Sequence, residues 1–542
     1  MHRPMLSLNR PPCDDGVVRS APDTPGCAER AKPWVLAATI LGSSMAFIDG
    51  SVVNVALPAI QADLAASVSG AQWVVNAYML MLGALMLVGG SAGDRFGRRR
   101  IFALGIIIFT AASVACGLAP NTTALIAARA AQGVGGALLV PSSLAIIGAS
   151  FPKEERGSAI GTWAGFSALT TALGPVLGGW LVDALSWRMI FFINLPLALI
   201  TLAIAFRYVP ESRDETNDAG VDWRGGLLAT LGLGAVVYGL TIASDLGWAH
   251  PAVFGALLAG ALALALFVRS EAHAPSPMMP LGLFQSATFS GANALTLLLY
   301  FALSGALFFL PFNLIRLQGY SATLAGAAFL PFTLIMGGLS RWSGGLFDRF
   351  GAKWPLIIGP VITAAGFALF ALPGIGGSYW TTFFPAMVLL GLGMAVSVAP
   401  LTTAVMDAVA ERHAGAASGI NNAISRVAGM LAVALLGAVA VGVFEAALDE
   451  RVAKLQLLPE VRQALEAEVP RLAEAEVPPQ VDGADRTVLA RALDESFLQS
   501  FRVVMLIATG LALASALCAA LTIRTSRDRI ARQSGISTTR PS

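Results

Sequence analysis

Two ionisable residues lie inside long apolar runs, where a charge is costly. Asp49 is in the run that begins near residue 34, and Arg129 is in the run that begins near residue 122. An ionised side chain at the centre of a bilayer costs about 2.5–3.5 kcal/mol on insertion scales, and a carboxylate escapes that cost by taking up a proton. Asp49 could therefore bind and release a proton, whereas Arg129 keeps its charge and needs a cavity, a carboxylate or carbonyls. The alternatives are a purely structural Asp49 near an outer mouth and an Arg129 that extends to the surface.

A charged turn occurs twice in the chain. Asp94-Arg95-Phe96-Gly97 follows one apolar run, and Asp348-Arg349-Phe350-Gly351 follows another. Two copies in equivalent places indicate a duplicated half, as in membrane proteins built from repeats. Glycine allows two helix ends to approach closely, and the acidic and basic residues can pair across the junction. An ordinary basic loop would explain the arginines but not the repeated order.

A third pattern combines glycine and proline inside an apolar run. Gly174-Pro175 is followed by Gly178-Gly179, with Gly161 upstream. Proline removes a backbone hydrogen bond and bends a helix, while glycines give a smooth face for close packing. The alternative is any kinked membrane helix.

Polar and aromatic residues in other apolar runs are candidates for contact with a small molecule. Promiscuous pockets are mostly apolar and aromatic with few polar groups, and plain helix packing is the alternative for each residue. The candidates are Asn76, Asn293, Tyr300, Phe308, Phe332, Phe384, Met387, Asn421, Asn422 and Arg426.

Composition places the chain in a membrane. Of 542 residues, 56% are hydrophobic and 13% are charged, and the mean hydropathy is +0.71, whereas soluble proteins carry about 25% charged residues. The net charge of +2 suggests no nucleic-acid partner. The four cysteines and four histidines form no metal or catalytic pattern, and no nucleotide-binding loop is present, so we expect no cofactor and no enzyme.

Fourteen apolar runs are long enough to span a bilayer. Most Lys and Arg fall in loops on one side, which predicts that both termini are cytoplasmic in a cell membrane. The predicted helices cover 34–57, 71–92, 101–119, 122–147, 157–183, 188–208, 224–243, 252–270, 288–315, 322–345, 354–373, 380–405, 415–444 and 499–523.

Four polar segments flank or interrupt these helices. We expect a disordered tail over 1–33, a cytoplasmic linker over 209–223 and a cytoplasmic tail over 524–542. Residues 445–497 mix charged residues with Leu and Val and contain three prolines. This segment is predicted to be a helical insertion outside the cell, with a partly ordered linker as the alternative.

Together the motifs resemble the major facilitator superfamily, and most closely its fourteen-helix drug:proton antiporter branch. The sequence departs from the family pattern at two places. Thr170 stands where the helix-five motif has Gly, and Ala92-Gly93 stands where the loop motif has Leu-Ala before Asp94. The matching stretches are Gly90–Arg99, Leu125–Gly135, Gly174–Gly179, Ile48–Pro58, Gln72–Tyr78, Ser186–Arg188, Asn194–Pro196 and Ser418–Asn422.

The resemblance implies an all-α polytopic membrane protein with two six-helix bundles, 34–208 and 288–444 with 499–523, plus two extra helices over 224–270. It implies proton coupling at Asp49 and Arg129. It implies a conformational latch from Asp94, Arg95, Gly97, Arg98, Asp348 and Arg349, and an antiporter motif from Gly161, Gly174, Pro175, Gly178 and Gly179.

The implied activity is export of hydrophobic or cationic small molecules, such as drugs or antibiotics, in exchange for protons, by a chain expected to be monomeric. Export of a lipid or lipid-linked molecule on the same fold is the alternative. Large apolar helix faces and the 445–497 insertion favour that alternative.

Overall fold

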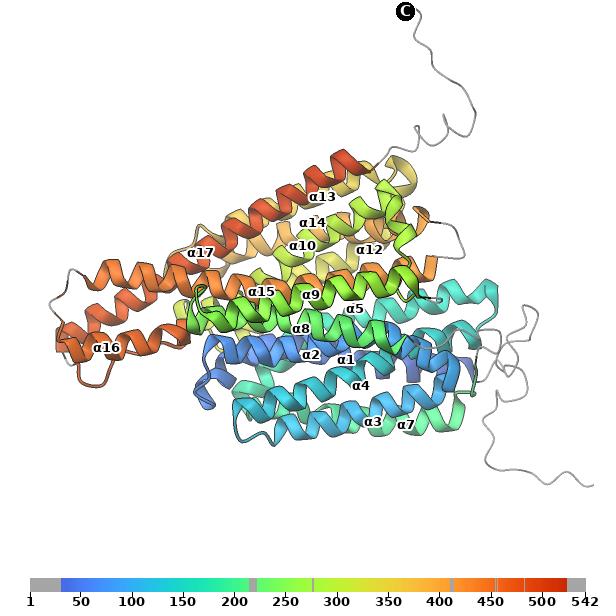
Figure 1. Cartoon of the computed structure of the whole chain (residues 1–542), viewed down its shortest axis with the longest axis horizontal. Helices are drawn as coiled ribbons and strands as arrows, with labels where there is room; N and C mark the ends of the chain where they lie inside the picture. Colours follow the sequence, from blue (N-terminus) through green and yellow to red (C-terminus); the bar gives the residue numbers. More distant parts are fainter. Residues whose placement is uncertain are drawn as a thin grey trace, which may run out of the picture. The chain divides into compact units, whose positions relative to one another are not determined.

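A computed structural model describes residues 31–213, 222–274, 277–409, 414–453, 455, 457–481 and 483–523. All regular structure in these residues is helical (Figure 1). Fourteen helices or helix pairs are long and apolar enough to cross a membrane, which confirms the fourteen predicted spans. The predicted tails over 1–33 and 524–542 lie almost wholly outside the described residues, as does most of the 209–223 linker.

The chain divides into two compact units. Unit 1 runs to Met278 and also takes in Tyr320–Ala327, while unit 2 holds Met279–Gly319 and everything from Ala328 onward. The helices of unit 1 are α1 (Lys32–Asp63), α2 (Val68–Phe96), α3 (Arg98–Gly117), α4 (Thr122–Ser150), α5 (Lys153–Ala184), α6 (Met189–Phe192), α7 (Asn194–Tyr208), α8 (Trp223–Leu246), α9 (Pro251–His273) and α11 (Ala322–Ala327).

Unit 2 carries the remaining helices, including those of the 445–497 segment. They are η1 (Leu281–Gln285), α10 (Ala287–Phe312), η2 (Asn313–Leu317), α12 (Leu330–Phe350), α13 (Lys353–Phe370), α14 (Tyr379–Asp407), α15 (Ala414–Val452), α16 (Pro459–Glu468), η4 (Val469–Glu474) and α17 (Gly483–Thr522).

Glycines bring α2, α3 and α4 together at backbone distance. A Cβ at Gly89 of α2 would lie 2.0 Å from the Ala137 carbonyl oxygen in α4, and one at Gly135 of α4 would lie 2.5 Å from the Phe109 nitrogen in α3. Buried aromatic and aliphatic side chains, among them Phe102 and Phe109, fill the space beside these contacts. This close packing fixes the helices that carry the polar residues of unit 1.

Two of the predicted helices are interrupted. The sixth stops at Ile193 and restarts as α7, in which Pro196 occupies the third position. The tenth stops after α11 and restarts as α12, in which Pro331 is the second residue. Proline fits the first turn of a helix but not its interior. The second break also divides the span between units, because α11 belongs to unit 1 and α12 to unit 2.

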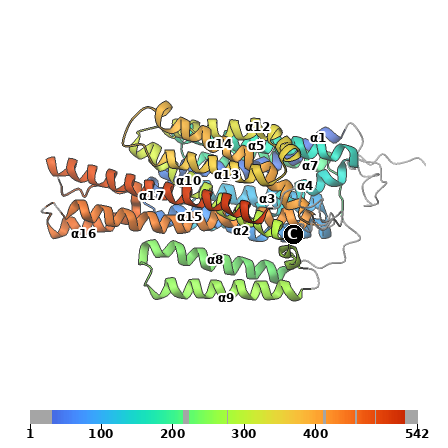
Figure 2. The same ribbon diagram turned by 90° about the horizontal axis from the view of Figure 1, so that it is seen from above.

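The two extra helices form an antiparallel hairpin. Figure 2 shows α8 and α9 side by side, and α8 packs on α2 within unit 1. Most side chains of α9 are exposed, as expected for a helix that faces lipid.

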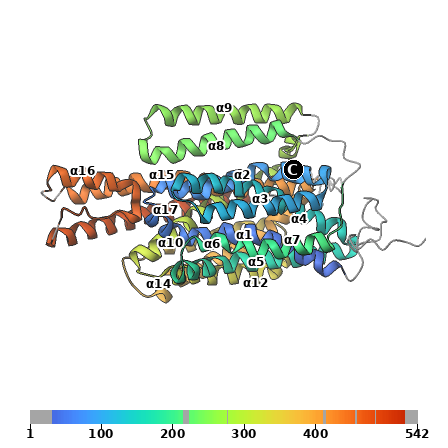
Figure 3. The ribbon, with the colours of Figure 1, turned by 90° about the horizontal axis from the view of Figure 1, so that it is seen from below.

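The 445–497 segment of unit 2 is mostly helical in its described residues. Both α15 and α17 extend beyond their apolar runs, and α16 and η4 come between them in the chain. Figure 3 shows α16 at the same end of the molecule as these extensions. We call residues 445–497 the cap.

Candidate functional site

The two charged residues of the apolar runs meet in the interior of unit 1. Asp49 of α1 and Arg129 of α4 are each 1% exposed, and Arg129 Nη1 forms an ion pair with Asp49 Oδ2. Gln132, one turn after Arg129, joins both partners. Its Nε2 donates to Asp49 Oδ1 at 2.7 Å, and its Oε1 accepts from Arg129 Nη1 at 2.6 Å. Both carboxylate oxygens of Asp49 therefore have a donor.

The network continues into α3 and α7. Gln132 Nε2 also donates to Ser113 Oγ at 2.7 Å, and Asn194 Nδ2 donates to the same oxygen at 3.2 Å. The Cys116 thiol lies 3.7 Å from Gln132 Oε1. Helices α1, α3, α4 and α7 thus share one buried polar cluster, which we call the Asp49 network.

Arg129 has further partners that keep it in the interior. Its Nε donates to the Val74 carbonyl oxygen of α2 at 3.0 Å. Its guanidinium carbon is 4.3 Å from the centre of the Tyr78 ring, and that ring is held by a hydrogen bond from its hydroxyl to the Ala46 carbonyl oxygen. Arg129 therefore does not extend to the surface, and an aromatic face adds to its stabilisation.

Protonation of Asp49 would change the charge balance of this arrangement. When a buried ion pair loses one charge, the other is left uncompensated, which costs about 3–5 kcal/mol. Protonation of Asp49 would create that situation at Arg129, because the described part of the chain offers it no second carboxylate. Loss of the charge on Asp49 would therefore destabilise this arrangement of the four helices.

Sequence reasoning missed Gln132, Ser113 and Asn194. None of them carries a charge, so the sequence alone does not distinguish them from other uncharged residues in the same apolar runs. The available signal was the spacing of Arg129 and Gln132, which are three residues apart and so lie on one face of a helix.

The predicted latch residues of the first turn pair locally. Arg98 Nε donates to Asp94 Oδ1 at 2.8 Å, and Gly97 has φ +112°, a conformation that favours glycine. Arg95 is exposed, with its guanidinium 5.7 Å from the Phe96 ring. In the second turn, the side chains of Asp348 and Arg349 lie outside the described part of the structure.

Glu211, which sequence reasoning did not select, holds the first turn. It accepts from the Arg99 backbone nitrogen at 3.1 Å and lies 3.6 Å from the Arg100 guanidinium. A Cβ on Gly97 would come within 2.6 Å of its carboxylate. The segment after α7 is thereby fixed to the α2–α3 turn.

The glycines of the helix-five motif contact two helices of unit 1. A Cβ at Gly174 would meet the Ser51 side chain, and one at Gly178 would lie 2.3 Å from Val52, both in α1. A Cβ at Gly179 would lie 2.2 Å from the Ala322 carbonyl oxygen of α11. Gly161 has open space around it.

The α5–α11 contact has a polar end as well. Asp183 of α5 accepts from the Ala322 and Thr323 backbone nitrogens at 3.1 and 2.7 Å. The carboxylate therefore caps the first turn of α11, a role that the sequence did not reveal.

The candidate substrate residues fall into three groups. Asn421 donates to Asn293 Oδ1 at 3.0 Å and to Thr296 Oγ1 at 2.7 Å within unit 2, whereas Asn422 donates to its own helix. Asn76 is fully buried in α2, and its amide has no hydrogen-bond partner in the described residues. Of the rest, Phe308, Phe332 and Met387 are buried, and Tyr300, Phe384 and Arg426 are half-buried.

The chain is similar to several known proteins. A family model described as Major Facilitator Superfamily matches residues 39–433. Multidrug resistance protein Stp of Mycobacterium tuberculosis is 35% identical over 492 residues, which cover 89% of this chain and 90% of that protein. The Tetracenomycin C resistance and export protein of Streptomyces glaucescens is 33% identical, with 93% and 94% covered. The Puromycin resistance protein pur8 of Streptomyces alboniger is 38% identical, with 76% and 82% covered.

A solved structure agrees on the fold. A bacterial homolog of the human lysosomal transporter Spinster, in an inward-facing and unoccupied conformation, has a TM-score of 0.64 and 18% sequence identity, and the match covers 91% of this chain and 98% of that one. The resemblance found in the motifs is therefore confirmed, and so is the expectation of a transporter rather than an enzyme. This multi-pass membrane protein belongs to the major facilitator superfamily.

Proposed function

We propose that this protein exports drugs or antibiotics across the cell membrane in exchange for protons, by alternating access of a central site. The names of the relatives support the substrate class, since they concern resistance to several drugs, to tetracenomycin C and to puromycin. The Asp49 network supports the coupling to protons.

The observation that carries the proposal is the fully buried pairing of Asp49 with Arg129 and Gln132. With Asp49 ionised, the carboxylate and the guanidinium neutralise each other in the interior of unit 1. When Asp49 takes up a proton, the ion pair is lost and Arg129 keeps the Gln132 oxygen, the Val74 carbonyl and the rings of Tyr78 and Phe191. The helices then favour another arrangement, which is the step that exposes the substrate site to the other side.

The direct test is transport into inverted membrane vesicles with an imposed pH gradient. The panel contains cationic dyes, antibiotics and fluorescent lipids. Wild-type protein accumulates drug-class substrates against their gradient. Asp49→Asn keeps the shape of the side chain but cannot titrate, so accumulation falls to the passive level while downhill exchange of substrate continues.

The matched control is Asp63→Asn. Asp63 ends the same helix, but it is half-exposed and pairs with Arg188 at 2.7 Å. This variant keeps gradient-driven accumulation. Full accumulation by Asp49→Asn would refute the role given to that carboxylate, and transport of lipids without drugs would favour the lipid-exporter alternative.

A further inference from the structure

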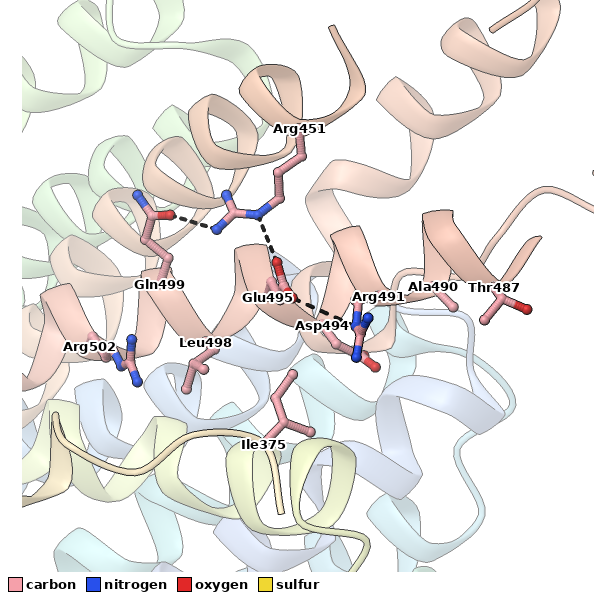
Figure 4. Close-up of a pocket in the computed structure, with 10 residues that line it drawn as sticks. All are labelled: Ile375, Arg451, Thr487, Ala490, Arg491, Asp494, Glu495, Leu498, Gln499 and Arg502. Atoms are coloured by element: carbon pink, nitrogen blue, oxygen red, sulfur yellow. Dashed lines mark hydrogen bonds and ion pairs between the residues drawn. The ribbon is translucent and has the colours of Figure 1, made fainter. Parts of the chain in front are cut away.

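A cavity of about 830 Å³ lies at the root of the cap, wholly within unit 2. Its walls come from α15, from α17 and from the 371–378 loop between α13 and α14 (Figure 4). The volume is in the range of sites for small ligands. Arg451, Arg491 and Arg502 bring three guanidiniums to it, and Asp494 and Glu495 bring two carboxylates.

Both carboxylates already face arginines. Glu495 lies 3.5 Å from Arg451 and 3.8 Å from Arg491. Asp494 lies 3.6 Å from Arg316, outside the cavity wall. A cationic ligand would have to displace these guanidiniums, so the acidic residues do not make this a cation site.

Arg502 is the lining arginine that still has a buried hydrogen-bond donor without an acceptor. It donates to the Pro373 carbonyl oxygen at 3.1 Å and to the Leu372 carbonyl oxygen at 3.5 Å. Its Nε is buried without a hydrogen-bond partner, and no carboxylate of the described residues lies within ion-pair distance. A buried donor without an acceptor is uncommon and costly. Three arginines and two carboxylates line the cavity, so its wall carries one positive charge in excess, and this surplus favours an anion.

The wall of the cavity also has apolar residues, Leu498 of α17 and Ile375 of the 371–378 loop (Figure 4). After Arg502 the apolar part of α17 begins. Leu506, one turn further on, is exposed, and the exposed stripe continues through Leu513 and Leu517 at helical spacing. An anionic group at Arg502 would thus have a continuous apolar surface beneath it for a tail.

We propose that this cavity binds the anionic headgroup, phosphate or carboxylate, of an amphiphile whose apolar part lies along the exposed stripe of α17. Arg502 supplies the principal contact, with Arg491 and Arg451 beside it. Two sources share this chemistry, a phospholipid of the surrounding leaflet and an anionic single-chain molecule. The site stands independently of the proton exchange proposed above, because its residues lie in unit 2 and the Asp49 network lies in unit 1.

The test measures binding by the full chain in neutral maltoside micelles. The probes are phosphatidylglycerol and phosphatidylcholine with the same fluorescent tail. Wild-type protein binds the anionic lipid at least tenfold more tightly than the zwitterionic one. Arg502→Gln weakens binding of phosphatidylglycerol by about ten- to hundredfold, the loss expected for a charged hydrogen-bond partner. It leaves phosphatidylcholine binding unchanged.

Two further variants separate binding from folding. Ile375→Trp fills the cavity from an exposed loop position without removing a charge, and it also weakens phosphatidylglycerol binding. Arg462→Gln removes an exposed arginine of α16 that does not line the cavity, and it binds like wild type. Equal binding of the two lipids by wild type, or unchanged phosphatidylglycerol binding in both cavity variants, would overturn the proposal.

Competition with decanoate distinguishes the sources. Displacement of phosphatidylglycerol by this single-chain carboxylate, lost in Arg502→Gln, supports a site that also accepts anionic cargo. Retention of the lipid in excess decanoate supports a phospholipid site.

Discussion

At the scale of single residues, the sequence revealed charges but not their partners. Asp49 and Arg129 stand out because a charge in an apolar run is rare. Their pairing depends on how α1 and α4 pack, and the sequence does not specify that register. Gln132 was not selected because a neutral amide gives no contrast in composition, yet it contacts both charged groups. Glu211 and Asp183 were missed because acidic residues at helix ends are common, so their position in the sequence does not reveal a specific partner.

Gln132 is a positioning residue for the Asp49 pair. We expect Gln132→Leu to slow proton-driven transport by about ten- to hundredfold, because Arg129 and Asp49 each lose a buried hydrogen bond, and such losses cost about 1–3 kcal/mol. Initial rates in the vesicle assay, with protein amount and thermal stability measured in parallel, test this.

The control for this prediction is Ser143→Ala. Ser143 shares a buried hydrogen bond of 2.7 Å with Ser43, so it also joins α4 to α1 but lies outside the network. A rate in Gln132→Leu no lower than in Ser143→Ala would show that Gln132 only packs.

At the scale of elements, the fourteen spans could be predicted because apolar length is a strong signal in a membrane protein. The breaks at Ile193 and between α11 and α12 were not predicted, although Pro196 and Pro331 mark them in hindsight. The boundaries of the cap were also harder to predict. Helix α15 continues past the end of its apolar run and α17 begins before its own, and no turn residue marks either change. The helix-five glycines were found as a motif. The sequence does not show which of them contact other helices, because that depends on how the helices pack.

That packing predicts unequal effects of alanine in α5. Gly178→Ala places a Cβ 2.3 Å from the Val52 side chain and 3.0 Å from its carbonyl oxygen, so α1 and α5 must separate. We expect a loss of about 1–3 kcal/mol in stability, typical of an overpacked contact. Thermal unfolding of the purified protein measures it.

Gly161→Ala is the matched control in the same helix. Apart from its chain neighbours and the nearby backbone of its own helix, no heavy atom lies within 4 Å of the added Cβ, and alanine favours helix over glycine by up to about 1 kcal/mol. We expect neutral or slightly raised stability. Equal losses in the two variants would contradict the assignment of Gly178 to the α1 contact.

The cap should respond to pH through Glu474. Burial raises the pKa of this half-buried carboxyl, although Arg316 and Arg471 oppose the shift. A carboxyl with a raised folded-state pKa adds stability below its unfolded-state pKa, and this stability is lost as the pH rises through the folded-state pKa. The cap is therefore expected to be more stable in mildly acidic solution than at neutral pH, and Glu474→Gln should remove that difference.

Hydrogen exchange of residues 457–481, corrected for the intrinsic rate at each pH, measures local stability of the cap. Glu466→Gln is the control, because its side chain is exposed on α16 and is not among the groups that shift the pKa of Glu474. A pH response that persists in Glu474→Gln would assign the effect to another group.

At the scale of the whole molecule, buried acids are the candidates for carrying protons during the transport cycle. In the described residues, two acidic side chains are nearly inaccessible, Asp49 in the Asp49 network and Glu271 near the end of α9 in the extra hairpin. Only Asp49 lies among the helices α1 to α7. We propose that the exchange moves one proton, carried by Asp49, inward for each substrate molecule that leaves.

This stoichiometry predicts how transport depends on membrane potential. Exchange of one proton for a singly charged cation moves no net charge, so a potential should change its accumulation little. Exchange of one proton for a neutral drug moves one charge, and 100 mV then supplies about 2.3 kcal/mol, roughly a fiftyfold change in accumulation. Reconstituted liposomes with a fixed pH gradient and a clamped potassium diffusion potential measure both. If accumulation of the cation also changed about fiftyfold, a second proton would have to cross, and Asp49 could not be the whole of the coupling machinery.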